Sequence, residues 1–169
     1  KTSDRDGSII LTADVAEHFV GWESIPSANI LNLSKKWAHE PEDFFKLEHV
    51  GKSDLGIINT AEFVSESKRV LGLDVSNSYF LFEYTNIMKP DDKMLAIVKA
   101  LKRNGLKLVM VSNMNTYHYQ YVSLVYPEVF KYFDYLMLSF QHGIKKPNPE
   151  MWIRPMKFLG LKAEECLFV

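Results

Sequence analysis

Residues 106–152, LKLVMVSNMNTYHYQYVSLVYPEVFKYFDYLMLSFQHGIKKPNPEMW, contain two short apolar runs that flank a segment with helical spacing. The runs are LKLVMVS (106–112) and YLMLS (135–139), and the segment between them is TYHYQYVSLVY (116–126). Short apolar runs bounded by turn residues are typical of buried strands, and a helix between two of them favours a right-handed parallel crossover. The stretch therefore predicts a strand–helix–strand unit in a parallel sheet.

The pattern continues on both sides of this unit. A helix is predicted over 91–105 and another over 149–160, and the final residues, CLFV (166–169), read as a third buried strand. Earlier, from 14 to 88, the sequence predicts only helices, over 13–22, 27–37, 41–50, 59–72 and 76–88. Asn59 and Glu62 fit a capping box, and Gly72 fits a helix end. The predicted fold class is α/β, with a Rossmann-like parallel sheet core and an inserted all-helical segment.

Composition limits the classes of protein. With 169 residues and 47% apolar content, the chain can bury one core with a small appended subdomain. Twenty basic and 21 acidic side chains give no electrostatic reason to expect nucleic acid or a membrane surface as the partner. The single cysteine, Cys166, excludes an intramolecular disulfide and a multi-cysteine zinc site, and it fits a reducing, cytoplasmic compartment. No apolar run is long enough for a membrane span.

Both ends of the chain are abrupt. The first residue is Lys1, and the apolar run at 166–169 has no polar turn after it. We expect the sequence to be cut at both ends.

Polar side chains follow the first two predicted strands. Ser112 and Asn113 end the first, where a hydroxyl and backbone amides can bind an oxyanion; the alternative is that they cap the next helix. Lys146 precedes Pro147, which favours an extended backbone and a fixed ammonium; the alternative is a solvated loop lysine. Its neighbour Lys145 is expected to face solvent.

Two carboxylates near the start of the chain form a further candidate site. Asp4 and Asp6 in SDRDGS stand on alternate residues, and carboxylates so spaced can divide nucleophilic and acid–base roles. A calcium loop with Gly7 at its turn and an exposed polar turn are the alternatives.

Together, VMVSNMN, FDYLMLSFQHGIKKPNPEMW and ECLFV resemble the haloacid dehalogenase superfamily, particularly its subfamily with a helical cap inserted early in the chain. Ser112 matches the second motif of that family and Lys146 the third, while DRDG looks like the first. Residues 45–63 are similar to the cap of sugar-phosphate phosphatases and of the phosphatase domain of soluble epoxide hydrolases.

The resemblance implies an incomplete α/β core at 1–14 and 89–169 with a helical cap at 15–88. It implies a Mg²⁺-dependent phosphohydrolase of a small phosphorylated metabolite, such as a sugar phosphate, with Asp4 as nucleophile and Asp6 as acid/base. Asp4 and Asp6 would hold Mg²⁺, while Ser112, Asn113 and Lys146 would bind the phosphoryl group. The strand before Asp4 and the acidic pair after 169 are absent from the sequence, so we expect the chain by itself to have little activity.

Two other functions stay open. A dehalogenase of the same fold attacks carbon without a metal and usually lacks the second aspartate, so Asp6 speaks against it. A non-catalytic phosphate-binding module is the other. His118 is left out of catalysis, and Phe19, Trp22, Phe44, Phe45 and Tyr84 are candidate cap-lining aromatics that we expect to be mostly core. The sequence does not define the substrate or the oligomeric state.

Overall fold

The computed structural model describes residues 44–85 and 90–168. Asp4, Asp6 and the helices predicted over 13–22 and 27–37 lie outside these ranges. In order, the described elements are α4 (Glu48–Asp54), α5 (Thr60–Leu71), α6 (Asn77–Thr85), α7 (Asp92–Arg103), β1 (Val109–Ser112), α8 (Thr116–Val125), η1 (Phe130–Tyr132), β2 (Tyr135–Leu138), α9 (Ser139–His142), α10 (Glu150–Leu159) and η2 (Ala163–Glu165).

The predicted parallel crossover is confirmed. Strands β1 and β2 pair in parallel, with Val109 opposite Tyr135 and Ser112 opposite Leu138, and α8 lies between them in the chain. Asp134 fixes the start of the sheet, because its carboxylate accepts hydrogen bonds from the backbone N–H of Leu108 (2.8 Å) and from the ammonium of Lys102 (2.6 Å). Because the strands run parallel in this register, both end at the same edge of the sheet, with Ser112 at the end of β1.

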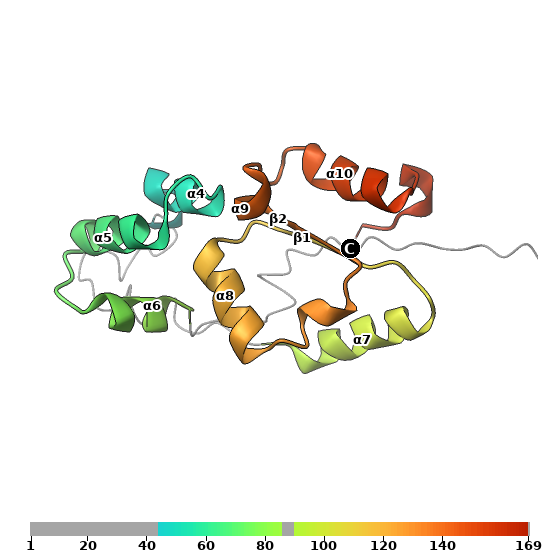
Figure 1. The fold of residues 1–169 in the computed structure, drawn as a ribbon, viewed down its shortest axis with the longest axis horizontal. Coiled ribbons are helices and arrows are strands. Elements are labelled where there is room, and N and C mark those ends of the chain that lie inside the picture. The colour runs from blue at the N-terminus through green and yellow to red at the C-terminus, as the bar shows by residue number, and fades with distance from the viewer. Residues whose placement is uncertain (1–43, 86–89, 169) are drawn as a thin grey trace, which may run out of the picture.

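The sheet divides the apolar residues between two layers, as alternation along a strand requires. Val109 and Val111 pack with Met137 and Met151, on the side where α10 lies (Figure 1). Leu108 and Met110 belong to the larger cluster, which includes Val98 of α7 and Val122 of α8. All four residues of β1 are buried, so the strand is covered on both faces, as is usual for parallel sheets.

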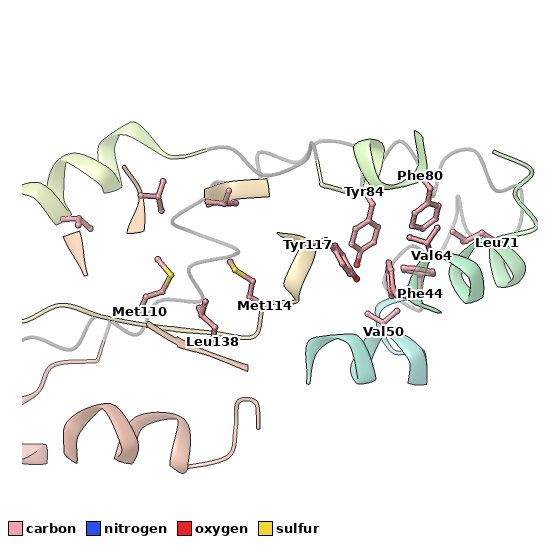
Figure 2. Close-up of a cluster of buried hydrophobic side chains, with 14 of the residues drawn as sticks. Phe44, Val50, Val64, Leu71, Phe80, Tyr84, Met110, Met114, Tyr117 and Leu138 are labelled. Carbon is pink, nitrogen blue, oxygen red and sulfur yellow. The ribbon is translucent and has the colours of Figure 1, made fainter. Parts of the chain in front are cut away.

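Helices α4, α5 and α6 lie together at the far end of the molecule from α7 and α10 (Figure 1). Their shared core is aromatic: Phe63 stacks on Tyr117 of α8, with ring centroids 4.8 Å apart, and Tyr84 packs edge-on against both rings. Figure 2 shows Tyr117 between this cluster and the residues beside the sheet. Aromatic contacts therefore join the helices of residues 44–85 to α8.

The capping box predicted at Asn59 and Glu62 is confirmed, whereas the helix predicted over 41–50 differs in its bounds from α4, which spans Glu48–Asp54. Asn59 accepts a hydrogen bond from the Glu62 N–H, the Glu62 carboxylate accepts one from the Asn59 N–H, and Gly72 ends α5 in the left-handed region with φ 67°. Helix α7 begins in the same way, because the Asp91 carboxylate accepts from the N–H groups of Lys93 and Met94. These polar caps satisfy amides that have no partner inside the helix.

The prediction of a third buried strand at 166–169 is wrong for its described residues. Residues 166–168 form no strand, and Leu167 and Phe168 are exposed. A strand needs a neighbour for its backbone groups, and the described sheet consists of β1 and β2 alone. Phe168 instead lies near Trp152 of α10, with ring centroids 6.0 Å apart. Among the described helices, none combines the length and apolar character needed to cross a membrane.

Candidate functional site

Ser112 is the polar residue at the carboxyl end of β1. Its side chain is 1% exposed, and its hydroxyl has no hydrogen-bond partner within the described part of the chain. A buried hydroxyl without a partner costs free energy, so such groups in folded proteins usually serve a bound water or ligand. Ser112 thus offers a donor at the sheet edge where ligands of parallel α/β proteins bind.

Asn113 brings the loop of Lys146 to this edge. The Lys146 backbone N–H donates to Asn113 Oδ1 at 2.8 Å, and Asn113 Nδ2 donates to the Lys146 carbonyl at 3.5 Å. Asn113 and Lys146, 33 residues apart in sequence, are therefore in direct contact. The peptide bond between Lys146 and Pro147 is cis, and Lys146 is half-buried. The structure thus places Asn113, which directly follows Ser112, in contact with the Lys146 backbone.

The alternative reading of Ser112 and Asn113 as helix caps is wrong. Helix α8 begins at Thr116, and its N-cap is Asn115, whose Oδ1 accepts a hydrogen bond from the His118 N–H at 3.0 Å. Met114 lies between, and its N–H donates to the hydroxyl of Ser139, the first residue of α9. With the capping done by Asn115, Ser112 and Asn113 stay available for other contacts.

The expectation that Lys145 faces solvent is also wrong. Lys145 is half-buried, and its ammonium reaches helix α4, where a Cβ added at Gly51 would stand 3.6 Å from Nζ. Its charge acts on the Asp54 carboxyl at the end of α4. Burial raises the pKa of Asp54 to about 6, while Lys145 and a hydrogen bond from the Asn115 side chain oppose that rise. Neither Asp54 nor Asn115 is among the site residues predicted from the sequence.

His118 has a structural role. It is buried, its ring stacks on Tyr84 with centroids 4.9 Å apart, and its Nε2 lies 3.3 Å from the Tyr84 carbonyl. Burial lowers the pKa of His118 to about 4, so the imidazole is neutral at pH 7. Of the candidate cap-lining aromatics, Phe44 and Tyr84 are buried core and Phe45 is 40% exposed, whereas Phe19 and Trp22 lie outside the described residues.

The described site combines a buried hydroxyl at the end of β1 with the contact between Asn113 and the Lys146 backbone. Hydroxyl and ammonium groups are donors of the kind that suit phosphoryl oxygens. Within 44–85 and 90–168, no three His, Cys, Asp or Glu side chains come together as a metal site would require. The candidate metal ligands, Asp4 and Asp6, lie outside these ranges.

Comparisons with known proteins agree with this geometry. The family described as "Hydrolase: haloacid dehalogenase-like hydrolase" matches residues 4–169. A glyceraldehyde 3-phosphate phosphatase from Methanocaldococcus jannaschii is 30% identical over 83 residues, which are 49% of this chain and 36% of that protein. The chain thus matches about a third of the length of this curated relative.

Solved structures share the fold. The HAD family enzyme BT-2542 from Bacteroides thetaiotaomicron, in complex with magnesium and inorganic phosphate, is similar with a TM-score of 0.79 and 20% identity, over 96% of this chain and 84% of that one. L-2-haloacid dehalogenase from Xanthobacter autotrophicus, with covalently bound chloropropionic acid, has a TM-score of 0.64 and 15% identity, over 96% of this chain and 68% of that one.

Proposed function

The chain belongs to the haloacid dehalogenase-like hydrolase family, and on that premise we propose that the protein is a Mg²⁺-dependent phosphohydrolase of a small phosphorylated metabolite. The observation that carries the proposal is the unpartnered, buried Ser112 hydroxyl next to the contact between Asn113 and the Lys146 backbone. A phosphoryl group has three equatorial oxygens that need donors and positive charge while it is transferred.

In this proposal, the described residues hold the phosphoryl group. The Ser112 hydroxyl and the Asn113 backbone amide donate hydrogen bonds to its oxygens, and the Lys146 ammonium offsets the charge of the phosphate and the attacking carboxylate. These interactions strengthen in a site from which water is excluded, because the effective dielectric constant there is low. Asn113 also holds the Lys146 backbone, which anchors the stem of this lysine beside the end of β1.

The covalent steps are assigned to Asp4 and Asp6 by the family resemblance. A carboxylate oxygen of Asp4 bonds to phosphorus while the bond to the leaving oxygen breaks, and Asp6 gives that oxygen a proton. Water then attacks the phosphoaspartate, returning its proton to Asp6 and releasing phosphate and the free Asp4 carboxylate. Asp4 and Asp6 also supply oxygen ligands of the kind Mg²⁺ prefers; once bound, the ion would neutralise negative charge at the site.

The relatives support the proposed substrate class. One curated relative is named as a glyceraldehyde 3-phosphate phosphatase, and BT-2542 was solved with magnesium and inorganic phosphate. We assign residues 15–88 to a cap that covers the site and selects the leaving group, in which α4, α5 and α6 form the described part. Small phosphorylated metabolites, such as sugar phosphates, are the substrates to test first.

The test is hydrolysis of a panel of phosphomonoesters by the full-length protein, with and without Mg²⁺. We expect Mg²⁺-dependent release of phosphate and a loss of turnover of at least a hundredfold in Lys146→Ala, because one preorganised charge in such a site contributes about 3 kcal/mol. Lys157→Ala, at an exposed position on α10, is the matched control and should keep full turnover. Phosphate binding without hydrolysis of any phosphomonoester would instead favour a non-catalytic phosphate-binding module, and metal-independent dehalogenation would favour a dehalogenase.

A further inference from the structure

One buried hydroxyl joins the turn after β1 to the end of helix α4. It belongs to Ser139, the first residue of α9, which is 0% exposed. The Met114 backbone N–H donates a hydrogen bond to the Ser139 oxygen at 3.0 Å, and the Ser139 hydroxyl donates one to the Asp54 carbonyl at 2.6 Å. These three residues come from distant parts of the chain, so the contact depends on the tertiary fold.

The Ser139 hydroxyl has one proton to donate and lone pairs with which to accept. The Met114 carbonyl also lies within hydrogen-bond distance of the Ser139 oxygen, at 3.1 Å, but the Asp54 carbonyl is the nearer acceptor. The hydroxyl therefore accepts from one backbone segment while it donates to another. Removal of this oxygen would take a hydrogen-bond partner from both segments at once, which is costly for buried backbone groups.

On one side, the contact holds the turn that contains the proposed phosphate ligands. Met114 directly follows Ser112 and Asn113, and its N–H belongs to the peptide group that joins it to Asn113. Because a peptide group is planar, a hydrogen bond that fixes this N–H also restricts the backbone of Asn113. The bond continues the pairing of the two strands beyond their last partners, Ser112 and Leu138.

On the other side, the contact holds the end of α4. Asp54 is the last residue of that helix, and the final carbonyls of a helix have no partner within it. Two further contacts hold the same end. The Ser53 hydroxyl lies 3.0 Å from the Tyr117 hydroxyl of α8, and Gly56 approaches the Phe140 backbone oxygen so closely that an added Cβ would collide with it.

We propose that Ser139 is a positioning residue. Its hydroxyl holds the turn of residues 112–115 in the shape in which the Ser112 hydroxyl and the Asn113 amide bind phosphate, and it ties this turn to the end of α4. Ser139 touches no reacting atom in this assignment and acts through the Met114 N–H. The inference rests on the proposed function, because it takes phosphate as the ligand of the turn.

The experiment compares Ser139→Ala with Ser67→Ala in the full-length protein. Ser67 is the matched control because it is also 0% exposed and its hydroxyl also has a hydrogen-bond partner, the Nε2 of His49 at 3.0 Å, but it lies in α5. NMR hydrogen exchange follows the Met114 amide, and calorimetry gives the Kd for inorganic phosphate. The Met114 amide should exchange about tenfold faster in Ser139→Ala than in Ser67→Ala. The Kd should rise about fivefold in Ser139→Ala and stay at the wild-type value in Ser67→Ala, even where the two variants lose similar stability.

Each part of the proposal has a result that would overturn it. Equal exchange rates of the Met114 amide in the two variants would overturn the role of the hydrogen bond, and a wild-type Kd in Ser139→Ala would overturn the role in phosphate binding. In the wild type, exchange of the Met114 amide at the rate of an unfolded chain would also overturn the hydrogen bond, and this measurement needs no variant to fold. A wild-type protein that binds no phosphate would overturn the proposed function, while the exchange of the Met114 amide would still test whether Ser139 holds the turn.

Discussion

Replacing Gly56 with alanine tests how closely the turn after α4 rests on α9. Gly56 has φ 68°, and a Cβ there would collide with the backbone oxygen of Phe140, which cannot rotate away as a side chain would. The left-handed conformation costs a residue with a Cβ about 1–2 kcal/mol, and forcing atoms into a filled space costs about 1–3 kcal/mol more. We therefore expect Gly56→Ala to lower the free energy of unfolding by about 2–5 kcal/mol.

Gly72→Ala separates the two causes. Gly72 has φ 67°, almost the same backbone conformation, but an added Cβ there would meet no atom within 4 Å. It should lose only the conformational cost, about 1–2 kcal/mol. Urea unfolding of the full-length protein, followed by circular dichroism at constant pH, measures both variants. Equal losses of stability would refute the close contact between the turn and α9.

Three further predictions concern single side chains. Asp134→Ala should cost about 2 kcal/mol, because it removes the partner of Lys102 and of the Leu108 N–H at a site only 17% exposed. Burial raises the pKa of Asp134, but hydrogen bonds from Lys102 and Leu108 outweigh burial and hold that pKa below its usual 3.8. The wild type should therefore lose this stability as the pH falls below 3.8 and through the lowered pKa of the folded state. Urea midpoints measured against pH should fall less steeply at acid pH in the variant than in the wild type. The buried, neutral His118 ring has a pKa of about 4 in the folded protein and 6.5 in the unfolded chain, so the free energy of unfolding should fall as the pH drops from 6.5 to 4. The NMR signals of the ring should not titrate between about pH 8 and 5. A titration midpoint near 6.5 in the folded protein would contradict this prediction. Asn113→Ala should weaken the binding of inorganic phosphate about five- to tenfold in calorimetric titrations, because it releases the Lys146 N–H, while the urea midpoint changes little. Unchanged affinity would count against a role of the contact between Asn113 and the Lys146 backbone in phosphate binding.

Helix α5 and the strand–helix–strand unit could be predicted from the sequence, whereas the helix predicted over 41–50 differs in its bounds from α4 and α9 was not predicted. The reciprocal bonds of Asn59 and Glu62, and the cap at Asp91, are contacts between residues two or three apart, so their pattern is visible in the letters. The apolar run at 166–169 carried no such information. Its residues look like a buried strand, but whether a strand forms depends on a neighbour far away in sequence, and Leu167 and Phe168 are exposed in the described structure.

The candidate site could be predicted in part. Ser112 and Lys146 were identifiable because their neighbours, a strand end and Pro147, restrict the backbone, and Asn113 brings the two together through contacts across 33 residues. Lys145 and Asp54 were not identifiable in this way. Their relation depends on where α4 packs, and the side chain of Lys145 gives no sign in the sequence that it points toward Gly51. An acidic residue at a helix end near a glycine reads as an ordinary exposed position.

The end of β1 is the proposed binding site for a phosphoryl group, and the affinity of the full-length protein for inorganic phosphate tests this assignment. The hydroxyls of Ser112 and Ser123 are both buried without a partner in the described structure, but Ser123 lies within α8. We predict that Ser112→Ala raises the Kd for phosphate about tenfold, the equivalent of about 1.4 kcal/mol, and that Ser123→Ala leaves it unchanged. Equal Kd values for the two variants would show that the Ser112 hydroxyl does not bind phosphate.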